Sequence, residues 1–419
     1  MTRMQSGHIL PSLDSIPRRR FLGGAALFYL GARLGTDPDT QAEPRTTQPK
    51  YRVGLIGCGR KGTQFARCYS MNPRSEVVAG ADIDPKNLAL FCERFKVKGY
   101  SDYREMLRNE RIDIAAPILP VKPNPAVVIG CAESGSGLKA IFCEKPMATS
   151  LEEADRMVEA CRSRGILLAA GDMYRNYPQI WTARGMIDSG ELGPVQSMNL
   201  YQSTDEISGG GCQGLSVMRM FAQDAEVEWV TGWVKGNAQS DDDQGMGGYV
   251  RFTNGIECFI HCKRSAKQGF EVLCTKGMFF TDWTSFRVWK SSKGEAAVRL
   301  ADIKEVSGLL ADSVPYGAYY DAEGWIYPGD RNIASVQSIV DALEKRTEPR
   351  SSGDNGRKVL EVAIALRESH RRNHAPVRLP LQDRSLKIIP VKGRLLNKKD
   401  VMGEAWYEDQ IQQLKKPKP

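Results

Sequence analysis

Short apolar runs alternate with longer amphipathic stretches along residues 51–172 of this chain. Each apolar run is short enough to form one buried parallel strand, and the runs cover 51–56, 76–81, 112–117, 140–143 and 166–170. The stretches 63–70, 126–134 and 150–164 between them predict helices. Strands and helices that alternate in this way predict an α/β fold with a doubly wound parallel sheet, which binds ligands at the carboxyl ends of its strands.

The first apolar run leads directly into a glycine-rich turn, Gly57-Cys58-Gly59-Arg60-Lys61-Gly62. In a G-x-G-x-x-G turn the glycines permit a tight bend, close approach of a pyrophosphate and close helix–strand packing. The helix that follows presents its free N–H groups and positive dipole end to phosphates. The second run ends at Asp82, twenty residues beyond Gly62, where a carboxylate can hold the ribose hydroxyls of adenosine. This arrangement predicts a dinucleotide site. It favours NAD over NADP because a carboxylate repels the extra phosphate, although Arg60 and Lys61 would offset part of that repulsion.

Glu144-Lys145-Pro146 follows the run 140–143 at once, which places Lys145 at the carboxyl end of a strand. A lysine there can bind a substrate hydroxyl and assist its proton transfer, provided that partial burial lowers the lysine pKa. Position alone supports equally a loop lysine that only pairs with Glu144. Pro117 opens a segment with four prolines in nine residues, 117–125, which predicts a stiff loop beside the cofactor.

The glycine turn, Asp82 and Glu144-Lys145-Pro146 together resemble the glucose–fructose oxidoreductase, inositol dehydrogenase and rhizopine-catabolism (Gfo/Idh/MocA) family. Arg175-Asn176-Tyr177-Pro178 and Gly190-Glu191-Leu192-Gly193-Pro194-Val195 extend the resemblance, which covers about 51–381. It implies a Rossmann domain over 51–172 and an α+β domain over 173–381 with a large, open-faced, mostly antiparallel sheet that supports a homo-oligomer. It also implies hydride transfer between NAD(P) and a sugar or polyol, with Lys145 acting on the reacting oxygen and Glu144 beside the nicotinamide. Candidate substrate ligands on this basis are Lys145, Arg175, Tyr177, Ser216 and Arg219.

The second domain departs from the family pattern at one segment. Many members carry Asp-x-Gly-x-His-x-x-Asp, which supplies an acid/base group, and alignment on Gly214 puts Cys212, Ser216 and Arg219 in place of the first Asp, the His and the last Asp. The chain has only four histidines, and His261 is the one candidate left for a catalytic histidine. It lies on the polar face of a predicted strand, which meets solvent, a partner subunit or the site. Asp205 and Asp224 are alternative sources of the missing group; otherwise the chemistry has changed or been lost.

The N-terminus has the pattern of an export signal. Arg18-Arg19-Arg20-Phe21-Leu22 begins a basic stretch that enters ten uncharged residues, 21–30, and resembles a twin-arginine signal over 1–35. A general secretory signal or a basic arm is the alternative. Residues 36–50, with three prolines, read as a linker. We expect a periplasmic or otherwise exported protein, folded and loaded with cofactor before export. No apolar stretch reaches the length of a membrane span.

The charge distribution and the cysteine pattern limit the kinds of partner and ligand that we expect. The 419 residues include 58 Lys and Arg against 50 Asp and Glu, a net charge of +8 concentrated at the two ends. The near-neutral middle argues against a nucleic-acid surface. The basic tail, 382–419, is expected to be frayed and solvated, with an arm on a neighbouring subunit as the alternative. Ten cysteines without a C-x-x-C pair indicate buried free thiols, and no metal site is predicted.

Three functions are compatible with these patterns. The first is an exported NAD-dependent oxidoreductase that acts on a sugar, polyol or sugar derivative and holds its cofactor tightly. The second is an NAD-dependent glycosidase that oxidises, eliminates, hydrates and reduces with no net redox change. The third is an NAD-binding homologue without catalysis, because the family histidine is absent.

Overall fold

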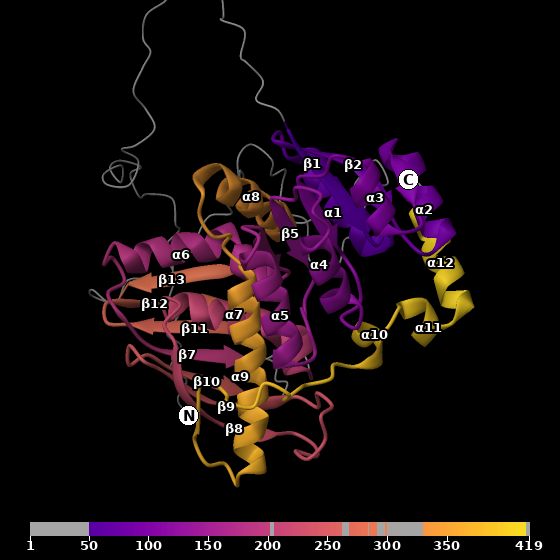
Figure 1. Cartoon of the computed structure of the whole chain (residues 1–419). Helices are drawn as coiled ribbons and strands as arrows, with labels where there is room; N and C mark the ends of the chain where they lie inside the picture. The colour runs from indigo at the N-terminus through magenta and orange to yellow at the C-terminus, as the bar shows by residue number, and fades with distance from the viewer. Residues whose placement is uncertain are drawn as a thin grey trace, which may run out of the picture. The chain divides into compact units, whose positions relative to one another are not determined.

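The computed structural model describes residues 50–201, 205–261, 268–283, 285–290, 298–299 and 330–415. The predicted signal peptide and all but the last residue of the predicted linker lie outside these ranges. Two sheets organise the described chain (Figure 1). No helix in these ranges is long and apolar enough to span a bilayer.

The first sheet has the strand order β3-β2-β1-β4-β5-β6, and all its neighbouring strands are parallel. Its strands are β1 (Tyr51–Ile56), β2 (Ser75–Ala81), β3 (Lys98–Tyr100), β4 (Ile114–Pro117), β5 (Ala140–Cys143) and β6 (Leu167–Ala170). The intervening helices are α1 (Arg60–Met71), α2 (Pro85–Phe95), α3 (Tyr103–Asn109), α4 (Asn124–Ala132) and α5 (Leu151–Arg162). This is a Rossmann-like sheet, and it confirms the fold class expected for the N-terminal domain.

Alternation along the strands sends side chains to both covered faces of this sheet. Val53 and Leu55 of β1 pack with α1 and α2, whereas Ile56 joins the cluster formed with α3, α4 and α5. Helix α8 (Asp330–Lys345) comes from the C-terminal half of the chain but buries Ile333 and Val336 in the α1 cluster. Both faces are therefore apolar, which explains why the strands read as continuous hydrophobic runs.

The second sheet has the order β14-β13-β12-β11-β7-β10-β9-β8-β15 in the described part of the chain. Only the β7–β10 pair is parallel there, so the expected large, mostly antiparallel sheet is confirmed. Its strands are β7 (Val195–Tyr201), β8 (Val227–Val234), β9 (Met246–Phe252), β10 (Glu257–His261), β11 (Gly269–Cys274), β12 (Gly277–Thr281), β13 (Phe286–Lys290), β14 (Val298–Arg299) and β15 (Val377–Arg378). Its helical segments are η1 (Met173–Asn176), α6 (Pro178–Asp188), η2 (Ile207–Gly211), α7 (Cys212–Phe221) and α9 (Gly353–Arg371).

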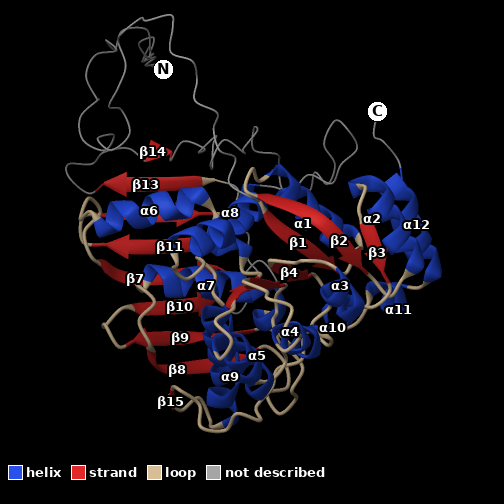
Figure 2. Cartoon of the chain, turned by 45° about the horizontal axis from the view of Figure 1, so that its top comes forward, coloured by secondary structure: helices blue, strands red, loops and turns tan. Residues whose placement is uncertain are grey.

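Helices α6, α7 and α9 lie on one face of this sheet, as Figure 2 shows from above. Leu366 of α9 packs directly on β8 and β9, because a Cβ at Gly232 would lie 2.3 Å from the Leu366 carbonyl oxygen and one at Gly248 would lie 2.5 Å from its Cδ2. The opposite face carries Trp233 and Phe259, whose rings are 5.8 Å apart. The sheet is thus covered on one side and has an aromatic outer face on the other.

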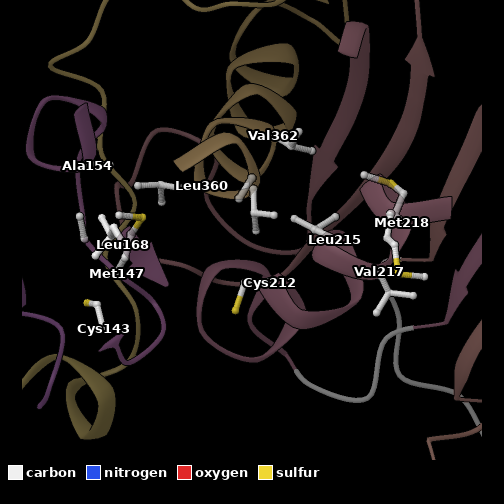
Figure 3. Close-up of a cluster of buried hydrophobic side chains, with 14 of the residues drawn as sticks. Cys143, Met147, Ala154, Leu168, Cys212, Leu215, Val217, Met218, Leu360 and Val362 are labelled. Atoms are coloured by element: carbon white, nitrogen blue, oxygen red, sulfur yellow. The ribbon is translucent and has the colours of Figure 1, made fainter. Parts of the chain in front are cut away.

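The two sheets meet through α9 and the end of β6. Ser352 forms a β-bridge with Ala169, and a Cβ at Gly353 would lie 2.5 Å from Leu168. Figure 3 shows Met147, Leu168 and Leu360 filling the space between the Rossmann elements and α9. This apolar junction fixes the carboxyl ends of β5 and β6 against α7 and α9.

The structure confirms the prediction for the thiols and contradicts the one for the C-terminal tail. All nine described cysteines are free and eight of them are buried, as expected, whereas Cys262 lies outside the described residues. The expectation of a frayed tail is wrong for residues 382–415, which include α10 (Lys392–Leu395), α11 (Lys398–Met402) and α12 (Glu404–Lys415). Tyr407 of α12 is 5% exposed, since it packs against the Rossmann domain, and this contact orders the segment.

Candidate active site

The glycine turn connects β1 to α1 in the form that the sequence predicts. Gly57 has φ +92°, and a Cβ there would lie 2.6 Å from the Ile118 carbonyl oxygen. A Cβ at Gly62 would lie 1.8 Å from the Gly57 carbonyl oxygen, so only glycine fits there. Gly59 differs, because among the described residues a Cβ there would meet only the side-chain amide of Asn87, at 3.7 Å. The space in front of Gly59 and the first turn of α1 is therefore open to a ligand.

Asp82, at the end of β2, lies against this turn. One carboxylate oxygen accepts a hydrogen bond from the Cys58 amide at 2.6 Å, and the other accepts one from the Asp84 amide at 2.8 Å. Partial burial raises the pKa of Asp82. The neighbouring Ile83 is 86% exposed and leaves an apolar surface beside the carboxylate. Asp84 caps α2 by accepting from the backbone of Lys86, as its position before Pro85 predicts.

Lys145 stands at the carboxyl end of β5, where the sequence places it. Its peptide bond to Pro146 is cis, and its Nζ donates to the Gly209 carbonyl oxygen at 3.2 Å. The buried Asn124 amide donates to the carbonyl oxygens of Glu144 and Pro146, at 3.1 and 3.3 Å, and holds this turn. Oε2 of Glu144 is buried without a hydrogen-bond partner in the described structure.

Pro117 and Lys61 lie beside this turn. Pro117 ends β4, and its carbonyl oxygen accepts from the Glu144 amide at 3.3 Å. Lys61 is half-buried in the first turn of α1 and donates to Gln64 at 2.9 Å. Burial lowers the pKa of Lys61 to about 8 against the opposing effect of Glu144. The glycine turn and the Lys145 turn therefore face the same region.

A cavity of about 20 Å³ lies at the end of β5 and β6, large enough for one water molecule. Its polar lining comes from Lys145, Asp172, Ser208 and Cys212, and its apolar lining includes Leu360 of α9. Lys145 thus shares this cavity with a carboxylate from the neighbouring strand end.

Asp172 is the site residue that sequence reasoning missed. It is 2% exposed, directly after β6, and accepts hydrogen bonds from Ser216 and, at 3.4 Å, from the Asn355 amide. Burial raises its pKa to about 6, although Arg175, Ser216 and Lys145 act in the opposite direction. Its place at the carboxyl end of a predicted parallel strand was a usable signal, because ligands bind at that edge.

Arg175, Ser216 and Arg219 form a buried polar network beneath the cavity. The Asn355 side chain joins it: its oxygen accepts from Arg175 and Arg219 at 3.2 and 3.1 Å, and its amide donates to Ser216 Oγ at 2.7 Å. Arg175 also makes a two-pronged ion pair with Asp224, at 2.8 and 2.5 Å. The structure thus places these residues around Asp172, and their direct contact with substrate stays a prediction.

Tyr177 lies in an aromatic group away from the cavity lining. Its hydroxyl donates to the Trp283 carbonyl oxygen at 3.4 Å and accepts from Arg331. The Tyr174 ring is 5.6 Å from the Tyr177 ring and 4.6 Å from the Trp283 ring. The role of Tyr177 in substrate binding also stays a prediction.

His261 lies on the outer face of the second sheet. Its ring stacks on Tyr201 at 4.4 Å and meets the edge of Phe259 at 4.6 Å, while Cys258 and Ile260 point to the buried side. His261 is not among the residues that line the Lys145 cavity. The structure does not bring the two together, because β10 presents alternate residues to opposite faces. Asp205, another candidate, pairs with Lys235 at 2.8 Å.

Comparisons with known proteins agree with this architecture. Residues 51–171 match the Gfo/Idh/MocA family model, described as an oxidoreductase family with an NAD-binding Rossmann fold. A myo-inositol 2-dehydrogenase from Thermotoga maritima is 24% identical over 342 residues, which are 76% of this chain and 96% of that protein.

Two solved structures have the same fold. An NAD binding oxidoreductase from Klebsiella pneumoniae has a TM-score of 0.67 and 17% identity, over 80% of this chain and 100% of its own. An aldose-aldose oxidoreductase from Caulobacter crescentus, complexed with glycerol, has a TM-score of 0.64 and 17% identity, over 79% and 100%. At 17% sequence identity, structural similarity of this kind is evidence for the fold.

The family model and the similar dehydrogenase identify the chain as an NAD-binding oxidoreductase. The match of residues 51–171 to the Gfo/Idh/MocA model supports the family resemblance seen in the sequence.

Proposed function

We propose that the protein transfers hydride between a tightly held NAD and a sugar, polyol or sugar derivative. The observation that carries this proposal is the cavity shared by Lys145 and Asp172 at the ends of β5 and β6. It lies at the edge of the sheet where the glycine turn binds a dinucleotide. The similar myo-inositol 2-dehydrogenase and aldose-aldose oxidoreductase support a polyhydroxylated substrate.

The residues present fit a dinucleotide. The open space in front of Gly59 suits a pyrophosphate, which the first-turn N–H groups of α1 would bind. Asp82 would hold the ribose hydroxyls and favours NAD over NADP. The unpartnered, buried Oε2 of Glu144 is available to a polar group of the cofactor near the reacting end.

Two groups of the chain manage the substrate proton. When bound, NAD accepts the hydride from the substrate carbon or returns it. As the hydride leaves the carbon, the hydroxyl proton must leave the oxygen, and Lys145 Nζ is placed to bind that oxygen and relay the proton. Asp172 is the acceptor at the far end of the relay, since its carboxylate lines the same cavity and is mostly ionised at pH 7. Val359 and Leu360 of α9 give the cavity an apolar wall.

Asp172 also bears on the absent family histidine. A protein that had lost catalysis would not need a buried carboxylate beside Lys145, and such a group costs stability when it ionises. We therefore favour an active enzyme over a non-catalytic homologue, with Asp172 as the acid/base partner in place of the histidine. Its supply from β6 rather than from the second domain explains why the family segment at Ser216 can differ.

Export and assembly complete the proposal. The basic and apolar pattern of residues 18–30 supports export of the folded, cofactor-loaded protein through a twin-arginine route to the periplasm. The aromatic outer face, with Trp233 and with Phe259 36% exposed, supports a homo-oligomer through the second sheet.

The test uses protein purified from its export route. Mass measurement after denaturation would find about one NAD per chain, and sugars or polyols would raise the absorbance near 340 nm. Lys145→Ala would keep the nucleotide and lose the absorbance change, whereas Lys235→Ala, a salt-bridged surface control, would behave as wild type. Aglycone release from aryl glycosides without lasting reduction would assign the glycosidase cycle instead. Absence of bound nucleotide, with none taken up from solution, would overturn the proposal.

A further inference from the structure

The C-terminal segment runs along the Rossmann domain after it leaves the second sheet. The carbonyl oxygen of Arg394 accepts from the Val121 amide at 3.0 Å, and that of Leu395 accepts from the Lys122 amide at 3.2 Å. Figures 1 and 2 show α10, α11 and α12 following one another along one side of this domain toward α2. The segment is therefore attached to the loop that follows β4.

Its far end is attached to the loop that follows β2. The Tyr407 hydroxyl donates to Asp84 Oδ1 at 2.5 Å, and Lys399 Nζ lies 3.8 Å from Asp84 Oδ2. Lys86 forms an ion pair with Glu408 of α12. These contacts dock α12 on the N-terminal end of α2, immediately beyond the ribose-binding candidate Asp82.

The order of the sheet decides what lies between the two attachments. Strand β1 sits between β2 and β4 in the sheet, and the turn Gly57–Gly62 follows β1. A chain that joins the loop after β4 to the loop after β2 over the few residues 395–399 must cross the carboxyl end of β1. Residues 395–399 therefore pass over the carboxyl end of β1, where the glycine turn begins.

Positive charges gather at this crossing. Lys398 begins α11 with its side chain partly exposed and partly buried, and this burial, followed by the charges of Arg60, Arg394 and Lys145, lowers its pKa. Arg394 and Lys399 have acidic partners, Glu206 at 2.7 Å and Asp84 at 3.8 Å. Lys398 thus lies within electrostatic range of Arg60 at this crossing, and an anion placed between the two like charges would relieve their repulsion.

We infer that Lys398 and Arg60 form the outer half of a site for a phosphate-type anion over the glycine turn, which the C-terminal segment closes. The inference rests on the proposed function, because the anion that reaches this place is the pyrophosphate of the dinucleotide. The N–H groups of α1 bind it from one side, and Lys398 neutralises it from the other. Release of the cofactor then requires the contacts of Tyr407 with Asp84 and of Arg394 with the β4 loop to open. The segment thus explains how an exported enzyme retains its nucleotide.

The first experiment measures release of the bound nucleotide from the holoenzyme, by exchange with excess labelled NAD. Lys398→Ala is expected to speed release about tenfold, and Lys398→Glu more, with a weaker dependence of release on salt. Lys392→Ala, an exposed lysine of α10 six residues earlier, is the control with the same charge change and should match wild type. Equal release rates for all three variants and wild type would overturn the inference.

A second experiment separates the inference from the proposed function. Titration of nucleotide-free protein with inorganic pyrophosphate should show binding that Lys398→Ala weakens about tenfold, whether or not any sugar is oxidised. Tyr407→Phe, which keeps the ring but loses the bond to Asp84, should speed NAD release without changing the charge. If NAD release is unchanged in Lys398→Ala while KM rises only for sugars that carry a phosphate or carboxylate, the anion belongs to the substrate and the pyrophosphate assignment fails.

Discussion

Replacement of Asp172 by Asn is expected to have opposite effects on catalysis and on stability, because both depend on the same buried carboxyl group. Burial raises the Asp172 pKa from 3.8 to about 6, a rise of about 2 units, which corresponds to ~3 kcal/mol. The folded state therefore holds its proton more tightly than the unfolded state does. Ionisation of Asp172 therefore lowers the stability of the fold. This loss of stability is absent below pH 4, grows between pH 4 and 6, and is complete above pH 6.

Asp172→Asn removes the ionisation and keeps one acceptor oxygen for Ser216 or Asn355. At pH 7.5 the variant is expected to be more stable than wild type by up to about 3 kcal/mol, and at pH 4 the two should be nearly equal. Turnover should fall about 100-fold or more, because the proton acceptor is lost. Wild-type sugar oxidation should rise through pH 6 as Asp172 ionises, and this limb of the profile should vanish in the variant.

Denaturant unfolding followed by tryptophan fluorescence at pH 4 and pH 7.5, alongside initial rates from pH 5 to 8, measures both effects. Asp205→Asn is the control, since Asp205 is a surface carboxylate, 62% exposed and paired with Lys235. A variant that is less stable than wild type at pH 7.5 and no worse at pH 4 would show that the carboxylate stabilises the fold. A variant with unchanged turnover would refute the relay from Lys145 to Asp172.

Further predictions concern the cofactor turn, the lysine and the outer face. Gly59→Ala should leave the melting temperature nearly unchanged but weaken NAD binding, because its Cβ meets only Asn87 at 3.7 Å in the described structure; equal NAD affinity by calorimetry would contradict the open space. Gly62→Ala should lower both, since its Cβ would lie 1.8 Å from a carbonyl oxygen, and a soluble, NAD-loaded variant would count against that clash. Lys145→Ala should reduce kcat about 100-fold or more at constant NAD content, as steady-state rates would reveal. Phe259→Glu should dissociate an oligomer in light scattering, and a wild-type monomer would rule out this interface.

The elements that could be predicted from the sequence share one property: each depends only on residues close to it in the chain. The glycine turn, Asp82 and the Lys145 turn each follow an apolar run, and backbone geometry alone requires glycine at Gly62. The carboxyl end of a parallel strand is defined by the chain itself, so the placement of Lys145 needed no knowledge of its neighbours. The same reasoning applied to β6 reaches Asp172, the last residue of the predicted Rossmann domain, 51–172.

What only the tertiary structure decided depends on which distant segments pack together. The environment of Asp172 comes from Ser216 on α7 and Asn355 on α9, and no spacing along the chain encodes that meeting. His261 was placed on a polar face by alternation, but which face covers the site depends on where α7 and α9 dock. The C-terminal segment reads as a solvated basic tail because its partners lie far back in the chain, such as Asp84, which pairs with Lys399 and accepts a hydrogen bond from Tyr407. Local patterns fix the turns and strand ends, whereas burial and charge pairing between remote segments create the environment of Asp172 and dock the C-terminal segment.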